Sequence, residues 1–339
     1  MKSPNIYDIA KLAGVSIATV SRVVNKSPRV REETRQRVLE IMEQQRYTPN
    51  VFARGLGLQS MSTIGLVCPD ISDPFMAQCL SLLERNLKEH NYSCLLACSG
   101  FGLEEKSRCL ENLLTKGVDA LILVGSHYSG EGEAVACIQR AAENLPVFII
   151  NGRVSGENIY NFYCMDYEAC YEATCYLLQN GQERILFLSD SESYSARRKQ
   201  GGYLAAMQDA GTAEQSRGLV SLQSHDPELG AKLARCLAEG WDAVLASEDS
   251  LAIAALKEAQ KLGLRVPEDL EIIGYNDLDY ARYSQPELSS INNHREQLCQ
   301  GASQILLRLL AGEVCSEHSF PVRCDLVHRG TTAWKGPGL

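Results

Sequence analysis

Residues 6–25 read IYDIAKLAGVSIATVSRVVN, and this stretch decides how the N-terminal part of the chain folds. The pattern predicts two short helices separated by Gly14-Val15. Asn5 is a suitable N-cap for the first helix, with Asp8 at the third helical position as in a capping box. Gly14 suits the position just past a helix end, where the backbone is commonly left-handed, and Ser16 is expected to cap the second helix.

The apolar residues of these two helices are expected to face each other. Ile9, Leu12 and Ala13 share one face of the first helix, and the residues expected to point back toward it are Val15, Val20, Val23 and Val24. The outward face of the second helix then contains Ile17, Ala18, Ser21, Arg22 and Asn25. This arrangement is typical of a helix-turn-helix whose second helix enters the major groove of DNA, although the spacing alone also fits an ordinary helical hairpin.

The same stretch resembles the DNA-binding headpiece of the lactose, galactose and purine repressor family. The resemblance continues through TRQRVLEIMEQQRYTPN (residues 34–50), which is similar to that family's third helix and hinge entry, and it extends over essentially the whole chain. It implies a sequence-specific transcriptional regulator, most often a repressor, that binds a pseudopalindromic double-stranded DNA operator as a homodimer. Arg31 departs from the family, which commonly has a capping Ser or Thr at the start of the third helix.

The charge distribution supports a nucleic-acid partner at one end of the chain. Residues 1–58 contain ten Lys and Arg against five Asp and Glu, whereas the remaining residues contain 23 against 37. A basic head on an acidic body indicates one surface that faces DNA, which the overall charge of −9 conceals.

By resemblance, Ile17 and Ala18 occupy the two specificity positions of the recognition helix, and Arg22 lies one turn further on. Arg is well suited to bidentate hydrogen bonding with guanine, whereas Ile17 and Ala18 have only apolar contacts to offer. Thr19, Ser21, Asn25 and Arg35 are assigned to phosphates. The full expected DNA-binding set is Ser16, Ile17, Ala18, Thr19, Ser21, Arg22, Asn25, Arg35, Arg54 and Leu56.

A short helix is expected at residues 51–58 (VFARGLGL), which form the hinge. The resemblance places Leu56 where a leucine of the family inserts into the minor groove and kinks the operator, with Arg54 nearby. Gly55 and Gly57 each disfavour helix by ~1 kcal/mol relative to Ala, so this helix is expected to form only on DNA. The alternative is a linker leucine that packs on the core.

After residue 62 the sequence alternates between apolar strand-like runs and helical stretches. The runs are TIGLVC (63–68), SCLLAC (93–98), DALILVG (119–125), PVFIIN (146–151), RILFLS (184–189), GLVSL (218–222), DAVLAS (242–247) and LEIIGY (270–275). Such alternation predicts an α/β fold with doubly wound parallel sheets. The segment beginning at Lys116 (KGVDAL) is echoed by the one beginning at Glu239 (EGWDAV), which suggests a duplication.

The resemblance implies a core of two lobes, like periplasmic binding proteins, with a ligand cleft between them. The expected domains are a headpiece (1–48), a hinge and linker (49–61) and an effector-binding and dimerisation core (62–339). Lobe 1 is expected at about 62–162 and 293–321, and lobe 2 at about 163–292 and 322–330. The chain is expected to cross between the lobes near residues 161–165, 289–293 and 320–323.

The resemblance also places a set of polar residues around the effector, with Phe75 as an apolar platform: Phe75, Asn151, Arg153, Arg197, Lys199, His225, Glu248 and Asn276. Several depart from the family's sugar-binding pattern; Lys199 stands where an arginine is usual and His225 where an aromatic often stacks. Planar polar groups with an apolar platform suit a carbohydrate or a charged derivative of one. Each polar residue could instead be a solvated cleft side chain, and Phe75 could simply pack in the core.

The thirteen cysteines are expected to be buried, reduced thiols, because their number is odd and no C-x-x-C occurs; Cys68, Cys94, Cys98 and Cys164 lie in strand-like runs. Six scattered histidines show no metal-ligand spacing, so neither a metal nor another cofactor is predicted.

Two other classes of protein, an enzyme and a small-molecule receptor, are alternatives to a regulator. An enzyme is disfavoured because Gly100-Phe101-Gly102 lacks the third glycine of a dinucleotide fingerprint and no other catalytic motif occurs. A two-lobed small-molecule receptor without a DNA role would need export. The N-terminus MKSPNIYDIA lacks the apolar segment of a signal peptide, and no apolar run approaches the ~18 residues of a membrane span. A cytoplasmic location, without membrane association, is therefore expected.

Overall fold

The structure is a computed structural model, and it describes residues 5–24, 27, 29–45, 47, 61–223 and 225–333. Three residues of the expected DNA-binding set, Asn25, Arg54 and Leu56, lie outside the described residues, as does the expected hinge helix at 51–58.

The described part of the N-terminal headpiece consists of three helices, α1 (Ile6–Ala13), α2 (Ile17–Val24) and α3 (Glu32–Gln44). The predicted capping box of α1 is confirmed: the Asn5 side chain accepts from the Tyr7 and Asp8 amides at 2.9 and 3.1 Å, and the Asn5 amide donates to Asp8 Oδ2 at 2.9 Å. Gly14 ends α1 in the left-handed conformation, at φ 64°. Asn5 therefore begins α1 and Gly14 ends it, as the sequence predicts.

The three helices pack around a small core of seven buried residues: Ile9, Ala10, Ala13, Val20, Val23, Val38 and Met42. The prediction for Leu12 was wrong, because this side chain is 55% exposed and Ala10 is buried in its place. Ala10 follows Ile9 on the side of α1 that faces α3, and α1 contacts both α2 and α3. The buried face of α1 is therefore turned by about one position from the i, i+3, i+4 expectation.

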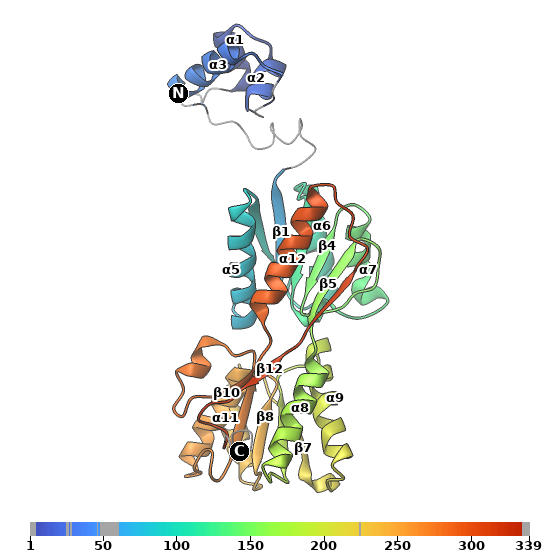
Figure 1. The fold of residues 1–339 in the computed structure, drawn as a ribbon, viewed down its shortest axis with the longest axis vertical. Coiled ribbons are helices and arrows are strands. Elements are labelled where there is room, and N and C mark those ends of the chain that lie inside the picture. The colour runs from blue at the N-terminus through green and yellow to red at the C-terminus, as the bar shows by residue number, and fades with distance from the viewer. Residues whose placement is uncertain are drawn as a thin grey trace, which may run out of the picture.

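The rest of the described chain forms two lobes, each built on a six-stranded sheet (Figure 1). The strand order of the first sheet is β11-β5-β4-β3-β1-β2, and that of the second is β12-β10-β9-β8-β6-β7. Neighbouring strands are parallel throughout, except that β12 runs antiparallel to β10. The predicted fold class, an α/β fold with parallel sheets, is confirmed.

The strands of the first sheet, in lobe 1, are β1 (Thr63–Cys68), β2 (Ser93–Cys98), β3 (Ala120–Val124), β4 (Val147–Ile150), β5 (Ile159–Cys164) and β11 (Ser319–Val322). Those of the second sheet, in lobe 2, are β6 (Ile185–Ser189), β7 (Arg217–Ser221), β8 (Ala243–Ala246), β9 (Glu271–Tyr275), β10 (Ser289–Asn292) and β12 (Asp325–Val327). The central strands are buried along their whole length, as expected for parallel sheets with helices on both faces.

In lobe 1, α5 (Pro74–Glu89) and α12 (Arg295–Leu310) cover one face of the sheet, and α6 (Leu103–Thr115) and α7 (Glu133–Ala142) cover the other. In lobe 2, α8 (Asp166–Gln179) and α9 (Tyr194–Asp209) lie on one face, opposite α10 (Leu229–Leu237) and α11 (Asp249–Lys261). None of the helices in these described segments has the length and apolar character needed to span a bilayer.

The chain passes between the two sheets three times. It leaves β5 at Cys164 to enter α8, leaves β10 at Asn292 to return to lobe 1 as α12, and passes directly from β11 to β12. The segment after β12 adds a further tie within lobe 2, because the Thr331 hydroxyl donates to the Ile272 carbonyl at 2.6 Å.

The echoed segments hold the same place in each lobe. Asp119 accepts from the Met61 and Thr63 amides at 3.0 and 2.8 Å, at the start of β1. Asp242 accepts from the Glu183 and Arg184 amides at 2.9 and 2.8 Å, at the start of β6. Each carboxylate therefore fixes the beginning of the first strand of its lobe to the strand beside it, which explains why the motif recurs.

The cysteines of the described residues are free thiols, and most are buried or half-buried. The expectation for Cys98 was wrong, because this residue is exposed, and Cys94 is only half-buried. Both belong to β2, which is the edge strand of its sheet, so one side of the strand has no neighbour. The apolar run SCLLAC gives no sign of this, since edge and central strands can have the same composition.

Candidate DNA-binding surface and effector cleft

The first turn of α2 presents small and apolar side chains to solvent beside a cation. Ser16 caps this helix, since its Oγ accepts from the Thr19 amide at 3.2 Å and lies 2.9 Å from Thr19 Oγ1. Ile17 is 41% exposed, and Ala18 and Arg22 are exposed as well. The opposite side of the helix is buried through Val20 and Val23. The helix therefore has one free face, which begins at its positively polarised end.

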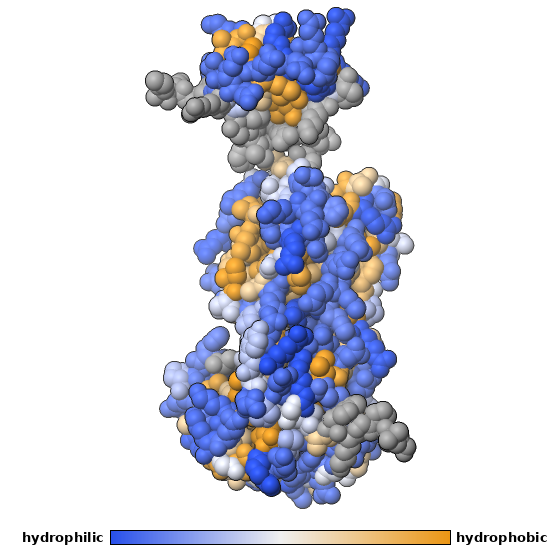
Figure 2. Space-filling model, turned by 60° about the vertical axis from the view of Figure 1, so that its left-hand side comes forward, coloured by the Kyte–Doolittle hydropathy of each residue, from blue (hydrophilic) through white to orange (hydrophobic). Residues whose placement is uncertain are grey.

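The surface of the headpiece is mainly hydrophilic, with separate apolar areas (Figure 2). Thr19 and Ser21, assigned to phosphates, are half-buried on α2. Arg35 has partners inside the headpiece: its Nη2 donates to the Ser27 carbonyl at 2.7 Å and its Nε lies 3.3 Å from Glu32. Arg35 therefore holds the turn before α3. At Arg31, the N-cap of α3, no side-chain capping bond forms, as the sequence analysis anticipated.

The candidate effector cleft lies where the carboxyl ends of parallel strands from both lobes meet. Its lining residues follow β1, β3 and β4 in lobe 1 and β6, β8 and β9 in lobe 2. Ligands of open α/β sheets characteristically bind at this edge, because the loops that follow the strands converge there.

Five of the eight residues predicted around the effector line one cavity between the lobes: Phe75, Asn151, Lys199, Glu248 and Asn276. Phe75 is only 6% exposed and packs in the core of lobe 1, whereas its role as an apolar platform for the effector stays a prediction. Arg197 lies in an adjoining cavity that shares Ser126, His127 and Ser193 with the first.

The structure does not bring Arg153 and His225 into either cavity. The Arg153 guanidinium lies 4.7 Å from the centre of the Tyr163 ring, on the outside of lobe 1. His225 is exposed; hydrogen bonds from Ser72 lower the pKa of Asp70, and the charge of His225 adds to the lowering. The resemblance places both residues around the effector, and neither of these two cavities supports that assignment, so it stays a prediction.

Lys199 has partners inside lobe 2. It is 6% exposed, its Nζ donates to the Ser247 carbonyl at 2.8 Å, and the ammonium lies 3.6 Å from the centre of the Tyr275 ring. Tyr275 in turn donates to Asp166 at 2.6 Å. Lys199 therefore links α9 to β8 and β9 while one side of it faces the cavity, and ammonium donors remain for a ligand.

The cavity also contains polar residues that the sequence analysis did not single out, notably Asp73, His127 and Asp190. Asp73 caps α5, since its Oδ1 accepts from the Met76 amide at 2.8 Å. Burial raises the pKa of Asp73, and Asp190 from the other lobe raises it further. Burial lowers the pKa of His127, which favours the neutral imidazole. Each of the three follows the end of a strand, a position that the sequence does reveal.

The two cavities differ in size. The inner one has a volume of about 60 Å³ and the adjoining one about 300 Å³. Pockets for small ligands usually have about 300–1,000 Å³. The inner cavity therefore needs the lobes or their side chains to move apart before it can hold more than a few atoms.

Comparison with known proteins identifies the parts of the chain. Residues 5–50 match the family described as "Bacterial regulatory proteins, lacI family", and residues 174–332 match "Periplasmic binding protein-like domain". An "HTH-type transcriptional regulator" of Lachnoclostridium phytofermentans is 41% identical over 332 residues, which cover 97% of this chain and 99% of the relative.

Two solved structures show the same fold. The lac repressor dimer bound to operator and the anti-inducer ONPF has a TM-score of 0.86 and 24% identity, covering 98% of this chain and 99% of the other. The transcriptional regulator CelR in complex with cellobiose has a TM-score of 0.69 and 24% identity, covering 97% and 99%. The headpiece match and the full-length relative together show that this chain belongs to the lacI family of bacterial transcriptional regulators.

Proposed function

We propose that the protein is a repressor that binds a pseudopalindromic operator as a homodimer. The observation that carries the proposal is the free, Ser16-capped face of α2, with Ile17, Ala18 and Arg22 exposed together. In a dimer, two such helices related by a two-fold axis require two inverted half-sites. Ile17 and Ala18 would contact thymine methyl groups, and Arg22 would pair with a guanine.

The remaining headpiece contacts are assigned to the phosphate backbone. Ser16, Thr19, Ser21 and Asn25 would fix the orientation of the helix, and Arg54 would bind phosphate or the minor groove. Arg35 is assigned a supporting role, because its guanidinium is bonded to Ser27 and Glu32. Leu56 would insert between the central base pairs from the hinge at 49–61, which connects the headpiece (1–48) to the core (62–339).

The effector is proposed to be a carbohydrate, or a charged derivative of one, bound between the lobes. The cavity offers carboxylates, amides and hydroxyls around the apolar edge of Phe75, a combination that suits a hydroxyl-rich ligand. Closure of the lobes around such a ligand would change the spacing of the two hinge segments in the dimer.

The family consists of transcriptional regulators, and we propose that this chain likewise has no catalytic role and acts in the cytoplasm, where its DNA lies. A receptor without a DNA role is the alternative. The headpiece argues against it, because a receptor has no use for a basic three-helix domain with a free recognition face.

Selection of bound fragments from random DNA tests the regulator directly. We expect an enriched motif with two inverted half-sites, and binding that weakens steeply with salt because cations of the headpiece displace counterions. Arg22→Ala should lower specific affinity by roughly 1–3 kcal/mol and relax one base pair in each half-site. Arg37→Ala, which removes an exposed arginine from α3, is the matched control. An equal loss of affinity for all sequences in Arg22→Ala would assign Arg22 to phosphate.

Two further measurements test the hinge and the cleft. Leu56→Ala should lose operator bending and specific affinity together, and an unchanged bending angle would exclude the wedge. A thermal-shift screen against mono- and disaccharides should find a ligand whose effect is lost in Asn151→Ala and Glu248→Ala but kept in Arg153→Ala, which lies outside both cavities. If Arg153→Ala alone abolished the thermal shift, the effector would bind outside both cavities.

A further inference from the structure

Cys68 and Cys98 form a pair of neighbouring thiols at one edge of lobe 1. Cys68 is the last residue of β1 and Cys98 the last residue of β2, and the two are register partners in this parallel pair. Cys68 is fully buried, whereas Cys98 is exposed. Burial raises the pKa of Cys68 to about 12, and the neighbouring Cys98 thiol raises it further. The pair thus places an accessible thiol beside a shielded one on adjacent strands.

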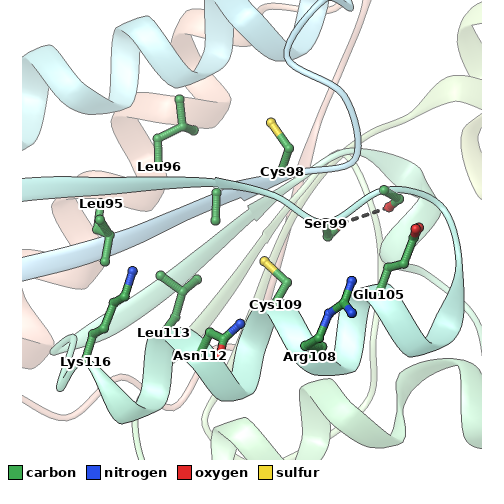
Figure 3. Close-up of a pocket in the computed structure, with 12 residues that line it drawn as sticks. Leu95, Leu96, Cys98, Ser99, Glu105, Arg108, Cys109, Asn112, Leu113 and Lys116 are labelled. Carbon is green, nitrogen blue, oxygen red and sulfur yellow. Dashed lines mark hydrogen bonds between the residues drawn. The ribbon is translucent and has the colours of Figure 1, made fainter.

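Cys98 lies on the wall of a groove of about 320 Å³ between β2 and α6 (Figure 3). A third thiol, Cys109, lies on α6 in the same groove. Cys98 points away from α6, whereas Cys109 points from α6 toward the strand. Cys68 belongs to the core cluster on the α5 side of the sheet. Cys94 packs against that cluster, and it lies four residues before Cys98, on the same side of β2. Cys98 therefore shares its face of the sheet with Cys68 and not with Cys109.

The loop that follows Cys68 leads to Asp73 in the inner cavity, and the loop that follows Cys98 packs beside it. They are joined to each other, since the Ser99 amide donates to the Cys68 carbonyl at 2.8 Å and the Gly100 amide to the Pro69 carbonyl at 3.1 Å. Ser99 Oγ lies 2.7 Å from the Tyr128 hydroxyl. The ring of Phe101 meets the ring of His127 edge-on, with centroids 4.8 Å apart. The thiol pair thus lies one or two residues from segments that hold the cavity residues Asp73 and His127 in place.

We propose that Cys98 and Cys68 form a reversible disulfide on exposure to a peroxide, and that this bond restrains the loops that line the cleft. The second part rests on the proposed effector site, whereas the first does not. The reaction begins at Cys98, because it is accessible and Cys68 is shielded and protonated.

The reaction takes two steps. Cys98 loses its thiol proton, and its thiolate attacks one oxygen of hydrogen peroxide, so that an S–O bond forms and the O–O bond breaks; the departing hydroxide takes up the released proton and leaves as water. The Cys68 sulfur then attacks the sulfur of the resulting sulfenic acid. The S–S bond forms, the S–O bond breaks, and the hydroxyl group leaves as a second water with the Cys68 proton. Two thiols lose two electrons, and one peroxide is reduced to two waters. A dithiol reductant reverses the change.

The test treats the full-length protein with hydrogen peroxide, blocks remaining thiols with N-ethylmaleimide and maps the products by mass spectrometry. We expect the loss of two of the thirteen free thiols and a link between the tryptic peptides 55–85 and 89–106. These peptides also contain Cys79 and Cys94, so fragmentation spectra must assign the bond to Cys68 and Cys98. Dithiothreitol should restore all thirteen thiols.

Three variants separate the roles of the thiols. Cys98→Ser should abolish the link. Cys68→Ala should leave a Cys98 sulfenic acid that the probe dimedone captures, and a thermal melt of the reduced protein checks that this buried substitution still folds. Cys109→Ser, which alters the same groove on its other wall, should leave the link intact. A bond from Cys98 to Cys109, a bond between Cys98 residues of two chains, or oxidation of Cys98 to sulfonic acid alone would each overturn the proposal.

Hydrogen exchange measures the effect on the cleft. Amides of residues 70–73 and 126–128 should exchange several-fold more slowly in the oxidised protein than in the reduced protein, with no change in Cys98→Ser. If the Cys68–Cys98 bond forms but amide exchange does not change, the restraint of the cleft loops is refuted and only the disulfide part of the proposal stands. Neither readout uses DNA or an effector, so failure of the proposed repressor function would not affect the result.

Discussion

Substitution of Gly202 by alanine should separate two helices of lobe 2. Gly202 lies in α9, where a Cβ would be 2.9 Å from the carbonyl carbon of Tyr167 and 3.0 Å from the amide nitrogen of Tyr171, and closer still to the Tyr167 carbonyl oxygen. These atoms belong to the backbone of α8, so no side chain can rotate to make room. The neighbouring Gly201 differs, because a Cβ there would meet only the Tyr167 ring at 3.4 and 3.5 Å.

The magnitude follows from two opposing effects. Replacing Gly by Ala inside a helix stabilises it by ~1 kcal/mol, and this gain applies at both positions. Overpacking typically costs ~1–3 kcal/mol, with the upper end expected where the obstacle is backbone. We therefore expect Gly202→Ala to lower the free energy of unfolding by about 2 kcal/mol, and Gly201→Ala to leave it unchanged or raise it by up to about 1 kcal/mol.

Urea denaturation of both variants, followed by circular dichroism, measures the difference. The two substitutions are adjacent and chemically identical, so the comparison isolates the contact with α8. Coincident unfolding curves for Gly201→Ala and Gly202→Ala would refute the reasoning, because they would mean that α8 and α9 are not in close backbone contact in solution.

The free energy of unfolding should depend on pH through Asp249, because burial raises the pKa of this residue from 3.8 to about 7 in the folded chain. The protonated form is favoured by folding, so the contribution of Asp249 is greatest at low pH and is lost as pH rises through 7, by roughly 2–3 kcal/mol between pH 5 and pH 8. Asp249→Asn should flatten this difference in urea titrations; an identical slope would contradict it. Asn5→Ala, which removes the capping box of α1, should destabilise the headpiece by ~1 kcal/mol and speed amide exchange in α1. Tyr275→Phe, which removes the donor to Asp166, should destabilise lobe 2 by ~1–3 kcal/mol, and an unchanged melting temperature would count against this buried network.

Eight of the twelve described strands, β1 to β4 and β6 to β9, could be predicted because each is a short apolar run bounded by turn residues. The other four, β5, β10, β11 and β12, lie where the chain crosses between the lobes and were not among the predicted runs. The capping box at Asn5 and Asp8 was equally accessible, since it depends on residues three positions apart. The exposure of Leu12 and of Cys98 could not be predicted. The first depends on how α1 turns against α3, and the second on which strand ends at the edge of the sheet.

The cleft shows the same division. Five residues assigned by resemblance line the inner cavity, because they follow strands that the sequence locates. Arg153 and His225 also lie near strand ends but line neither cavity: Arg153 lies over the Tyr163 ring, and His225 is exposed. The proximity of Asp73 and Asp190 could not be predicted, because the two residues are more than a hundred positions apart in sequence and belong to different lobes.

The Asp119 carboxylate also determines how far the headpiece can reach. By binding the Met61 and Thr63 amides, it fixes the point where the chain enters lobe 1. Twelve residues, 49–60, separate that point from the headpiece (1–48). Fully extended, they span at most roughly 45 Å, whatever conformation they adopt. The C-terminal end of the headpiece must therefore lie within that radius of the start of lobe 1, and a deletion in this segment would shorten the reach of each headpiece by about 3.5 Å per residue.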